Sequence, residues 1–303
     1  MAEITYLRRK EIDSTRWDRC ILGAKNSVAY ALSSYLDALC DGQWDALVAG
    51  DYEAVFPLPW RKKWGISYIY MPFFCQQLGV FSATEIWNQD AFIRAIPRHF
   101  RLIHLQLNPS FPFALPCKKR SNYVLHLQHS FETLCNHFNA DAQKNLRKLD
   151  QLLIQYNTQI SVAEVIDVYR QAWGESNPNI HTADYARFEI ACTQMAEEGQ
   201  VWTLGAYREQ ELLGAALFLV SPRFVHYVCA GPTAAGRSVG IMHGIIREAI
   251  RRYANTPVYL DFEGSEIPGV AKFYQKFGPE NRPYFSYTEN RLPRLLRRLK
   301  SGY

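Results

Sequence analysis

Hydrophobic and polar positions near the C-terminus predict a strand, a turn and a helix in quick succession. Apolar residues crowd positions 258–262, a short run typical of a strand, and Gly264 breaks it. Pro268 suits the first turn of a helix, because the N–H that proline lacks has no intrahelical partner there. Gly278 marks the helix end. Apolar side chains recur at the spacing of one helix face, at Val270, Phe273, Tyr274 and Phe277.

The rest of the chain alternates strands and helices in both halves. Strands are expected as a hairpin within 44–59 around a Gly50-Asp51 turn, and at 66–71, 102–107, 123–127, 201–207, 212–220 and 224–230. Helices are expected within 16–40 and at 81–99, 131–155, 164–171, 185–198 and 238–253. Hairpins followed by helical crossovers predict an α/β fold with mixed (α+β) sheets.

A chain of 303 residues predicts roughly two domains of about 150 residues each, because chains longer than about 250–300 residues usually divide into domains. Both halves show a similar order of elements without a sequence repeat, which favours two copies of one fold. We expect a first domain at 1–130, a linking helical segment at 131–158, a second domain with the active site at 159–290, and a basic amphipathic tail at 291–303.

Composition fits a globular protein, with 48% hydrophobic and 21% charged residues. A net charge of +5 is too small for a dedicated nucleic-acid binder and favours a negatively charged ligand. The seven cysteines form no C-x-x-C pair, which is typical of free thiols in a reducing cytosol. No secretory leader and no apolar run of 18 residues is evident, so we expect a cytoplasmic protein.

A glycine-rich loop at 230–240 precedes the helix expected at 238–253. Glycines permit close approach of a backbone to a ligand, and a helix N-terminus favours phosphate. This segment is therefore a candidate pyrophosphate site, and an ordinary strand-to-helix loop is the alternative. The candidate donor-binding residues are Gly231, Gly236, Arg237, Ser238 and Gly240.

Asp261 and Glu263 alternate along the strand at 258–262 and its end, so we expect them to share a face. A carboxylate beside a cleft can accept a proton from an attacking amine. The alternative is a solvated pair, or a helix cap at Glu263. Tyr274 is a candidate proton donor to a leaving group, although a helical tyrosine among apolar residues is more often part of a core.

The histidines predict no metal site, since His126 and His129 span a strand end and His243 has no nearby partner in the sequence. Basic clusters occur at 8–10, 61–63, 118–120 and 144–148. The tail at 291–303 suits contact with RNA or an anionic membrane surface, but packing of Leu292, Leu295, Leu296 and Leu299 onto the body is the favoured interpretation.

Phe273-Tyr-Gln-Lys-Phe-Gly278 resembles the helix motif of the GCN5-related N-acetyltransferase (GNAT) superfamily. The resemblance implies that Tyr274 protonates the departing coenzyme A thiolate and that the loop at 231–240 binds the coenzyme A pyrophosphate. Arg237-Ser-Val-Gly240 supplies only the first half of that family's R-x-x-G-x-G/A signature, and Pro279 replaces the aromatic residue that usually follows the glycine.

Three further segments resemble the Fem peptidyltransferase branch of bacteria, which has two acetyltransferase-like domains in tandem: Pro57–Gly65, Gln76–Phe81 and Asp261–Ser265. This resemblance implies direct acyl transfer to an amine. It implies an acyl-CoA donor, or aminoacyl-tRNA with a cell-wall precursor as acceptor, although 131–158 is short for a tRNA-binding arm. No tightly bound cofactor is implied. A non-catalytic tandem domain that binds a ligand or a partner is the third reading.

Overall fold

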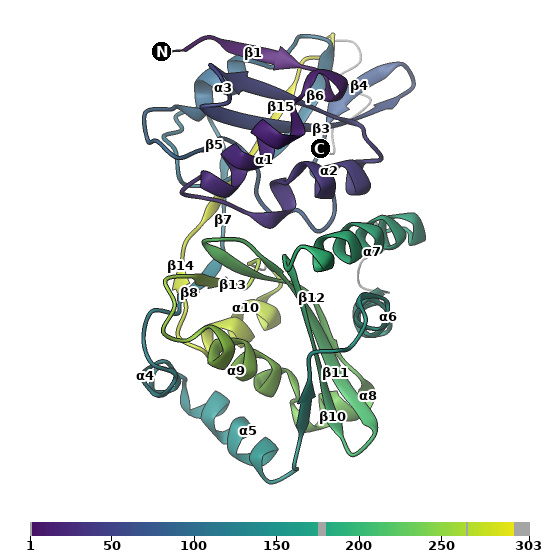
Figure 1. The fold of residues 1–303 in the computed structure, drawn as a ribbon, viewed down its shortest axis with the longest axis vertical. Coiled ribbons are helices and arrows are strands. Elements are labelled where there is room, and N and C mark those ends of the chain that lie inside the picture. The colour runs from purple at the N-terminus through teal and green to yellow at the C-terminus, as the bar shows by residue number, and fades with distance from the viewer. Residues whose placement is uncertain (1, 175–179, 265, 294–303) are drawn as a thin grey trace. The chain divides into compact units, whose positions relative to one another are not determined.

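The computed structural model describes residues 2–174, 180–264 and 266–293. The chain forms two compact units (Figure 1). Among the described residues, unit 1 combines the chain up to residue 120 with residues 283–293, and unit 2 lies within 121–282. Each unit holds a mixed sheet, with one parallel strand pair among antiparallel pairs, and this confirms the expected fold class.

Unit 1 is built on a sheet whose strands follow the order β1 (Ile4–Leu7), β2 (Trp44–Ala49), β3 (Ala54–Lys63), β4 (Ile66–Ile69), β6 (Phe100–Leu107), β15 (Tyr284–Asn290) and β7 (Lys118–Arg120), with β5 (Phe81–Ser82) beside β3. Its helices are α1 (Ser14–Gly23), α2 (Ser33–Cys40) and α3 (Gln89–Ala95), with 3-10 turns η1 (Arg9–Glu11) and η2 (Ala29–Ala31).

Helices cover both faces of the unit 1 sheet, which explains why all six residues of β2 are buried. On one face Trp44 contacts Trp17 of α1, with ring centroids 4.9 Å apart. On the other face Leu47 belongs to the same cluster as Phe92 and Ile93 of α3. A strand buried on both sides has no polar face, and its sequence is a continuous apolar run broken by one acidic residue.

Unit 2 is built on a sheet whose strands follow the order β14 (Glu280–Asn281), β8 (Tyr123–His126), β13 (Tyr259–Asp261), β12 (Phe224–Pro232), β11 (Glu211–Val220), β10 (Val201–Arg208) and β9 (Gln155–Asn157). Its helices are α4 (Phe131–Asn136), α5 (Ala140–Asp150), α6 (Val162–Trp173), α7 (Thr182–Glu197), α8 (Ala234–Val239), α9 (Met242–Tyr253) and α10 (Pro268–Gln275). In Figure 1, α6 and α9 lie on opposite sides of β10–β12.

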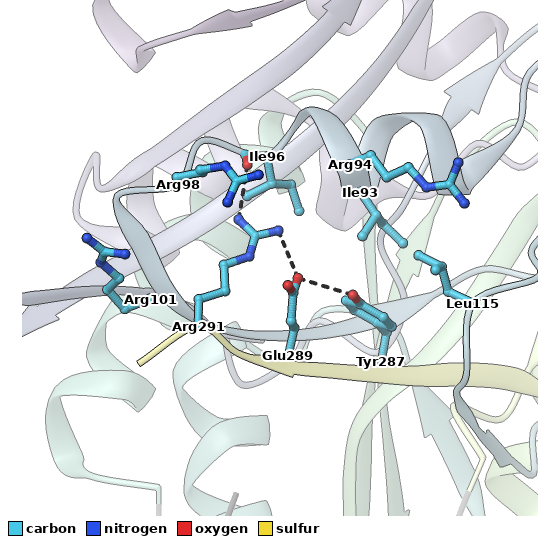
Figure 2. Close-up of a pocket in the computed structure, with 9 residues that line it drawn as sticks. All are labelled: Ile93, Arg94, Ile96, Arg98, Arg101, Leu115, Tyr287, Glu289 and Arg291. Carbon is cyan, nitrogen blue, oxygen red and sulfur yellow. Dashed lines mark hydrogen bonds and ion pairs between the residues drawn. The ribbon is translucent and has the colours of Figure 1, made fainter. Parts of the chain in front are cut away.

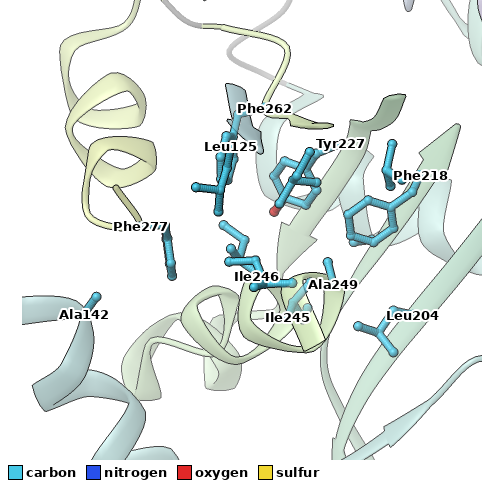
Figure 3. Packing of buried hydrophobic residues seen from close by; sticks show 14 of the residues in the cluster. Leu125, Ala142, Leu204, Phe218, Tyr227, Ile245, Ile246, Ala249, Phe262 and Phe277 are labelled. Atoms are coloured by element: carbon cyan, nitrogen blue, oxygen red, sulfur yellow. The ribbon is translucent and has the colours of Figure 1, made fainter. Parts of the chain in front are cut away.

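The apolar face of α9 forms the centre of the unit 2 core, as the spacing predicted. Ile245, Ile246 and Ala249 face Phe218 and Tyr227 of the sheet (Figure 3). Burying a side chain of this size contributes about 1.5–3 kcal/mol.

Two predicted helices are shorter or divided in the structure. Only Gln89–Ala95 of the segment 81–99 is helical, because Ser82 joins the sheet through β5 and donates its hydroxyl to the Glu53 carbonyl at 2.7 Å. The segment 131–155 forms α4 and α5. Asn139 divides them, since its side chain accepts from the Ala142 N–H at 2.9 Å and caps α5.

The division into units differs from the expected domain boundaries. Strand β8, placed in the first domain by its position, pairs with β13 in unit 2, whereas β15, placed in the second, pairs with β6 in unit 1. The segment 131–158 is an integral part of unit 2, because Leu146 and Leu149 of α5 belong to its core. In the tail Leu292 is buried, and the remainder from 294 lies outside the described residues.

Candidate active site

Strands β12 and β13 bring a histidine and two carboxylates together inside unit 2. The parallel pairing places His226 directly opposite Asp261. The Nδ1 atom of His226 lies 2.7 Å from Oε1 of Glu263 and 3.9 Å from Oδ2 of Asp261. His226 and Asp261 are almost fully buried, whereas the Glu263 side chain keeps 15% of its surface exposed. Of the three side chains, that of Glu263 is therefore the most exposed.

Asp261 and Glu263 point the same way, as expected, but a turn after the strand brings them together and not alternation along the strand. Strand β13 ends at Asp261, and Glu263 lies beyond it with a φ of 61°. A left-handed backbone is unfavourable for a non-glycine residue and often marks a functional position. The Glu263 N–H donates to Oδ1 of Asp261 at 2.8 Å, which holds this turn. The turn directs both carboxylates toward His226.

Asp261 has its oxygen atoms occupied by the protein. Oδ2 accepts from Nδ2 of Asn122 at 3.0 Å, and Oδ1 accepts from the Glu263 N–H. Asn122 directly precedes β8, whose antiparallel register with β13 places it beside Asp261. Since its lone pairs are used in this way, Asp261 is suited to orienting its neighbours.

Burial favours the neutral form of each member of this cluster. It raises the pKa of Glu263 to about 8 and that of Asp261 to about 6, and it lowers the pKa of His226 to about 4. A carboxyl with a pKa near 8 is partly ionised at neutral pH, which suits a general base.

Tyr274 faces the same cluster from α10. Its ring packs on Phe262 with centroids 5.0 Å apart and meets Tyr227 edge-on at 6.1 Å. Burial raises the pKa of Tyr274, and the negative charges of Glu263 and Asp261 add to the effect. The hydroxyl therefore stays protonated at neutral pH and is available as a proton donor.

Strands β12 and β13 separate beyond this cluster. Their ladder covers only Phe224–His226 of β12, although β12 continues to Pro232. At the far end the indole N–H of Trp173, at the end of α6, donates to the Ala230 carbonyl at 2.9 Å. The cluster thus sits where the sheet opens.

The structure assigns packing roles to the glycines of the loop at 230–240. A methyl group on Gly236 would overlap the Leu213 carbonyl of β11, and one on Gly231 would lie 2.8 Å from Cβ of Ala172 in α6. Gly240 ends α8 with a φ of 73°. These positions require glycine whether or not a ligand binds.

Most backbone N–H groups of the loop are also engaged. Thr233 caps α8 and accepts from the Gly236 N–H through its hydroxyl and from the Arg237 N–H through its carbonyl. The N–H groups of Gly240 and Ile241 donate to carbonyls of α8. The side chains of Arg237 and Ser238 are exposed, and the Arg237 guanidinium lies 4.9 Å from the centre of the Trp173 ring. Side chains here are thus more available to a phosphate than the backbone.

Replacing Gly236 by alanine is expected to destabilise unit 2 by about 1–3 kcal/mol, because α8 must move away from β11 to admit the methyl group. Gly269→Ala in α10 is the matched control, since a methyl group there meets no atom within 4 Å. Urea denaturation measures both. Equal stability of the two variants would contradict the assigned packing role.

The free energy of unfolding is expected to fall as pH rises from about 6.5 to 8. In this range Glu263, with a pKa of about 8, keeps a proton in the folded state that it loses in the unfolded chain. The folded state therefore binds more protons, and the slope reaches about 1.4 kcal/mol per pH unit. In the folded state the pKa values of His226 and Asp261, about 4 and about 6, lie below this range, but His226 regains its ordinary pKa of 6.5 on unfolding, which reduces the slope near pH 6.5. Chemical denaturation of the protein and of Glu263→Gln tests this, since the variant should lose the slope; the same slope in both would refute it.

Sequence reasoning missed His226 and Asn122. His226 lies in an apolar strand, and only the parallel register of β12 with β13 reveals its partners. The helix between these two strands did indicate a parallel crossover, so this histidine had a weak signal. Asn122 had none, because 139 residues separate it from Asp261.

A cation could in principle contact His226, Asp261 and Glu263, whose ligand atoms lie within 4.8 Å of one another. The expectation of no metal site did not consider this group. Nδ1 of His226 lies 2.7 Å from Oε1 of Glu263, so the two groups are in direct contact within this set. Among the described residues, no helix combines the length and apolar character needed to cross a membrane.

Comparison with known proteins agrees with this architecture. Residues 137–273 match the family model of the acetyltransferase (GNAT) domain, a segment that contains the carboxylates and the loop at 230–240 and ends one residue before Tyr274. No curated protein sequence matches the chain.

Solved structures match over nearly the whole chain. The crystal structure of FemX aligns with a TM-score of 0.70 at 12% identity, over 99% of this chain and 100% of FemX. A conserved protein of unknown function from Bacteroides thetaiotaomicron VPI-5482 aligns with a TM-score of 0.61 at 11% identity, over 94% and 99% of the two chains. The C-terminal domain of a putative lysylphosphatidylglycerol synthetase from Agrobacterium fabrum aligns with a TM-score of 0.55 at 11% identity, over 91% of each chain.

At such identities these structures establish a shared fold, and the family match associates acyl transfer with the segment inside unit 2. Residues 137–273 thus resemble the GNAT acetyltransferase domain, and the chain as a whole shares the fold of FemX.

Proposed function

We propose that the chain is an N-acyltransferase that moves an acyl group from an acyl-CoA donor to an amine acceptor by direct attack. The observation that carries the proposal is the partly buried Glu263, with a pKa of about 8, which lies against His226 where β12 and β13 separate. A base of this pKa at the opening of a GNAT sheet suits deprotonation of an amine.

Glu263 takes the proton of the attacking amine as the new C–N bond forms. Its partial exposure lets the amine reach the carboxylate. His226 packs against the carboxylate, and Asp261, anchored by Asn122, holds the turn that orients Glu263. Glu263 is thus the catalytic base, and the other groups position it.

Tyr274 donates its proton to the sulfur as the C–S bond breaks. The raised pKa of Tyr274 keeps its hydroxyl protonated before the reaction. As the C–S bond breaks, the sulfur becomes a thiolate, which is a stronger base than the thioester sulfur and can accept this proton. Backbone N–H groups of β12 between Tyr227 and Ala230 polarise the thioester carbonyl. The amine proton ends on Glu263 and the tyrosine proton on coenzyme A, so the step balances.

Arg237 and Ser238 contact the coenzyme A pyrophosphate through their side chains. Binding through side chains differs from binding of the pyrophosphate by backbone N–H groups, because the N–H groups of Gly236, Arg237 and Gly240 already have partners within the loop. Gly231, Gly236 and Gly240 then contribute by shaping the loop.

Thermal denaturation with separate donors tests the proposal. Coenzyme A and acetyl-CoA are expected to raise the melting temperature, since a ligand at 100 times its Kd contributes about 2.7 kcal/mol. The shift should be smaller in Arg237→Gln. A shift only with aminoacyl-tRNA would replace the donor and favour a Fem-like peptidyltransferase acting on a cell-wall precursor. No shift with any donor would favour a non-catalytic tandem domain.

A further inference from the structure

A cavity in unit 1 is lined by four arginines and has no role in the proposed acyl transfer. Its volume is about 430 Å³, within the range of small-molecule sites. The arginines come from four places: Arg94 from α3, Arg98 from the turn that follows it, Arg101 from the start of β6, and Arg291 from just beyond β15 (Figure 2).

Arg291 is held rigidly at the centre of this cavity. Its Nη2 lies 2.8 Å from Oε2 of Glu289, and its Nη1 donates to the Ile96 carbonyl at 3.1 Å. Its backbone N–H donates to the Arg101 carbonyl at 2.8 Å, and its side chain is only 18% exposed. The guanidinium is therefore positioned before any ligand arrives, which lowers the entropy lost on binding.

Among the described residues that line the cavity, Glu289 is the only carboxylate, and it is paired with Arg291. The hydrogen bond from Arg291 lowers the pKa of Glu289, and the Tyr287 hydroxyl also donates to it, at 3.2 Å. Glu289 therefore remains ionised and its charge is matched by Arg291. Four guanidinium groups against one carboxylate leave a formal charge of +3.

Arg94, Arg98 and Arg101 carry this excess charge. Their side chains are exposed, and within the described part of the chain none of them forms an ion pair. Figure 2 shows Arg94 and Arg101 toward opposite ends of the cavity, with Arg98 beside Arg291. Apolar side chains of Ile93, Leu115 and Tyr287 also line it. The cavity thus combines separated cationic groups with an apolar wall.

We propose that this cavity binds a small phosphorylated molecule. The planar guanidinium group matches phosphate oxygens in pairs, and a ligand with two or three negative charges would balance the excess of +3. The apolar wall would contact the organic part of the ligand. All the lining residues of this cavity belong to unit 1, whereas the residues proposed for acyl transfer belong to unit 2.

Calorimetric titration of the full chain with inorganic pyrophosphate tests this proposal. Saturable binding is expected, with a Kd at least tenfold weaker in the double variant Arg98→Gln/Arg101→Gln. Both side chains are exposed, so the variant should fold, and an unchanged melting temperature confirms this. Arg237→Gln in unit 2 is the control and should retain the binding.

Three outcomes would overturn the proposal. They are equal affinity in the double variant and the parent, loss of binding in Arg237→Gln alone, and equally tight binding of citrate, which would indicate a carboxylate site. Acyl-transfer turnover in the double variant is expected to be unchanged. A failure here is therefore distinguishable from a failure of the proposed function.

Discussion

Glu263→Gln is expected to reduce acyl-transfer turnover by about 10²–10⁴-fold, the usual contribution of a general base. Glutamine preserves the shape of the side chain but cannot accept the amine proton. In the parent protein, turnover should rise with pH toward a pKa of about 8, because the carboxyl must be ionised to act. In the variant this rise should disappear. Steady-state rates from pH 6 to 9 measure both effects.

Two comparison variants separate the base from its surroundings. Glu211→Gln replaces an exposed carboxylate at the start of β11 and should leave turnover unchanged. Asp261→Asn removes the neighbouring charge and should slow turnover less than Glu263→Gln does, since Asp261 is a positioning residue. If Asp261→Asn abolished the pH-dependent rise and Glu263→Gln retained it, the base would be Asp261.

Tyr274→Phe is expected to lower turnover with an acyl-CoA by about 10²-fold while the fold is retained. Phenylalanine keeps the ring contacts with Phe262 and Tyr227 and removes only the hydroxyl. The loss should be smaller with a thioester of a more acidic thiol, because such a leaving group needs less protonation.

The control for this variant is Tyr253→Phe, a tyrosine of α9 that packs against Trp202. Its turnover should match that of the parent. Unchanged turnover in Tyr274→Phe, or an equal loss with both kinds of thioester, would show that the hydroxyl is not the acid.

Local pattern predicted most elements that the structure contains, because helix and strand periodicity depend on near neighbours in the chain. The strand, turn and helix at 258–278 are present, and so is the crossover from β12 through α9 to β13. The helices predicted at 81–99 and 131–155 were too long, because Ser82 joins the sheet and Asn139 caps a new helix.

The pairing of strands that lie far apart in the chain could not be predicted from local sequence pattern. Strand β8 falls within the expected first domain, because nothing in its four residues identifies its partner β13, over 130 positions away. The same limitation hid the cluster: Asp261 and Glu263 were visible as candidates, but His226 and Asn122 reach them only through register between strands. The positive φ of Glu263 was also hidden, since glutamate gives no signal for it.

The placement of β15 has a consequence for synthesis on the ribosome. This strand lies between β6 and β7 in the unit 1 sheet, and its partners in β6 were made roughly 180 residues earlier. Unit 2 has all of its strands once residue 282 emerges, whereas the unit 1 sheet must wait for residues 284–290. The half of the protein that is translated first is therefore the last to complete its sheet, and until then the edge of β6 is open to wrong partners.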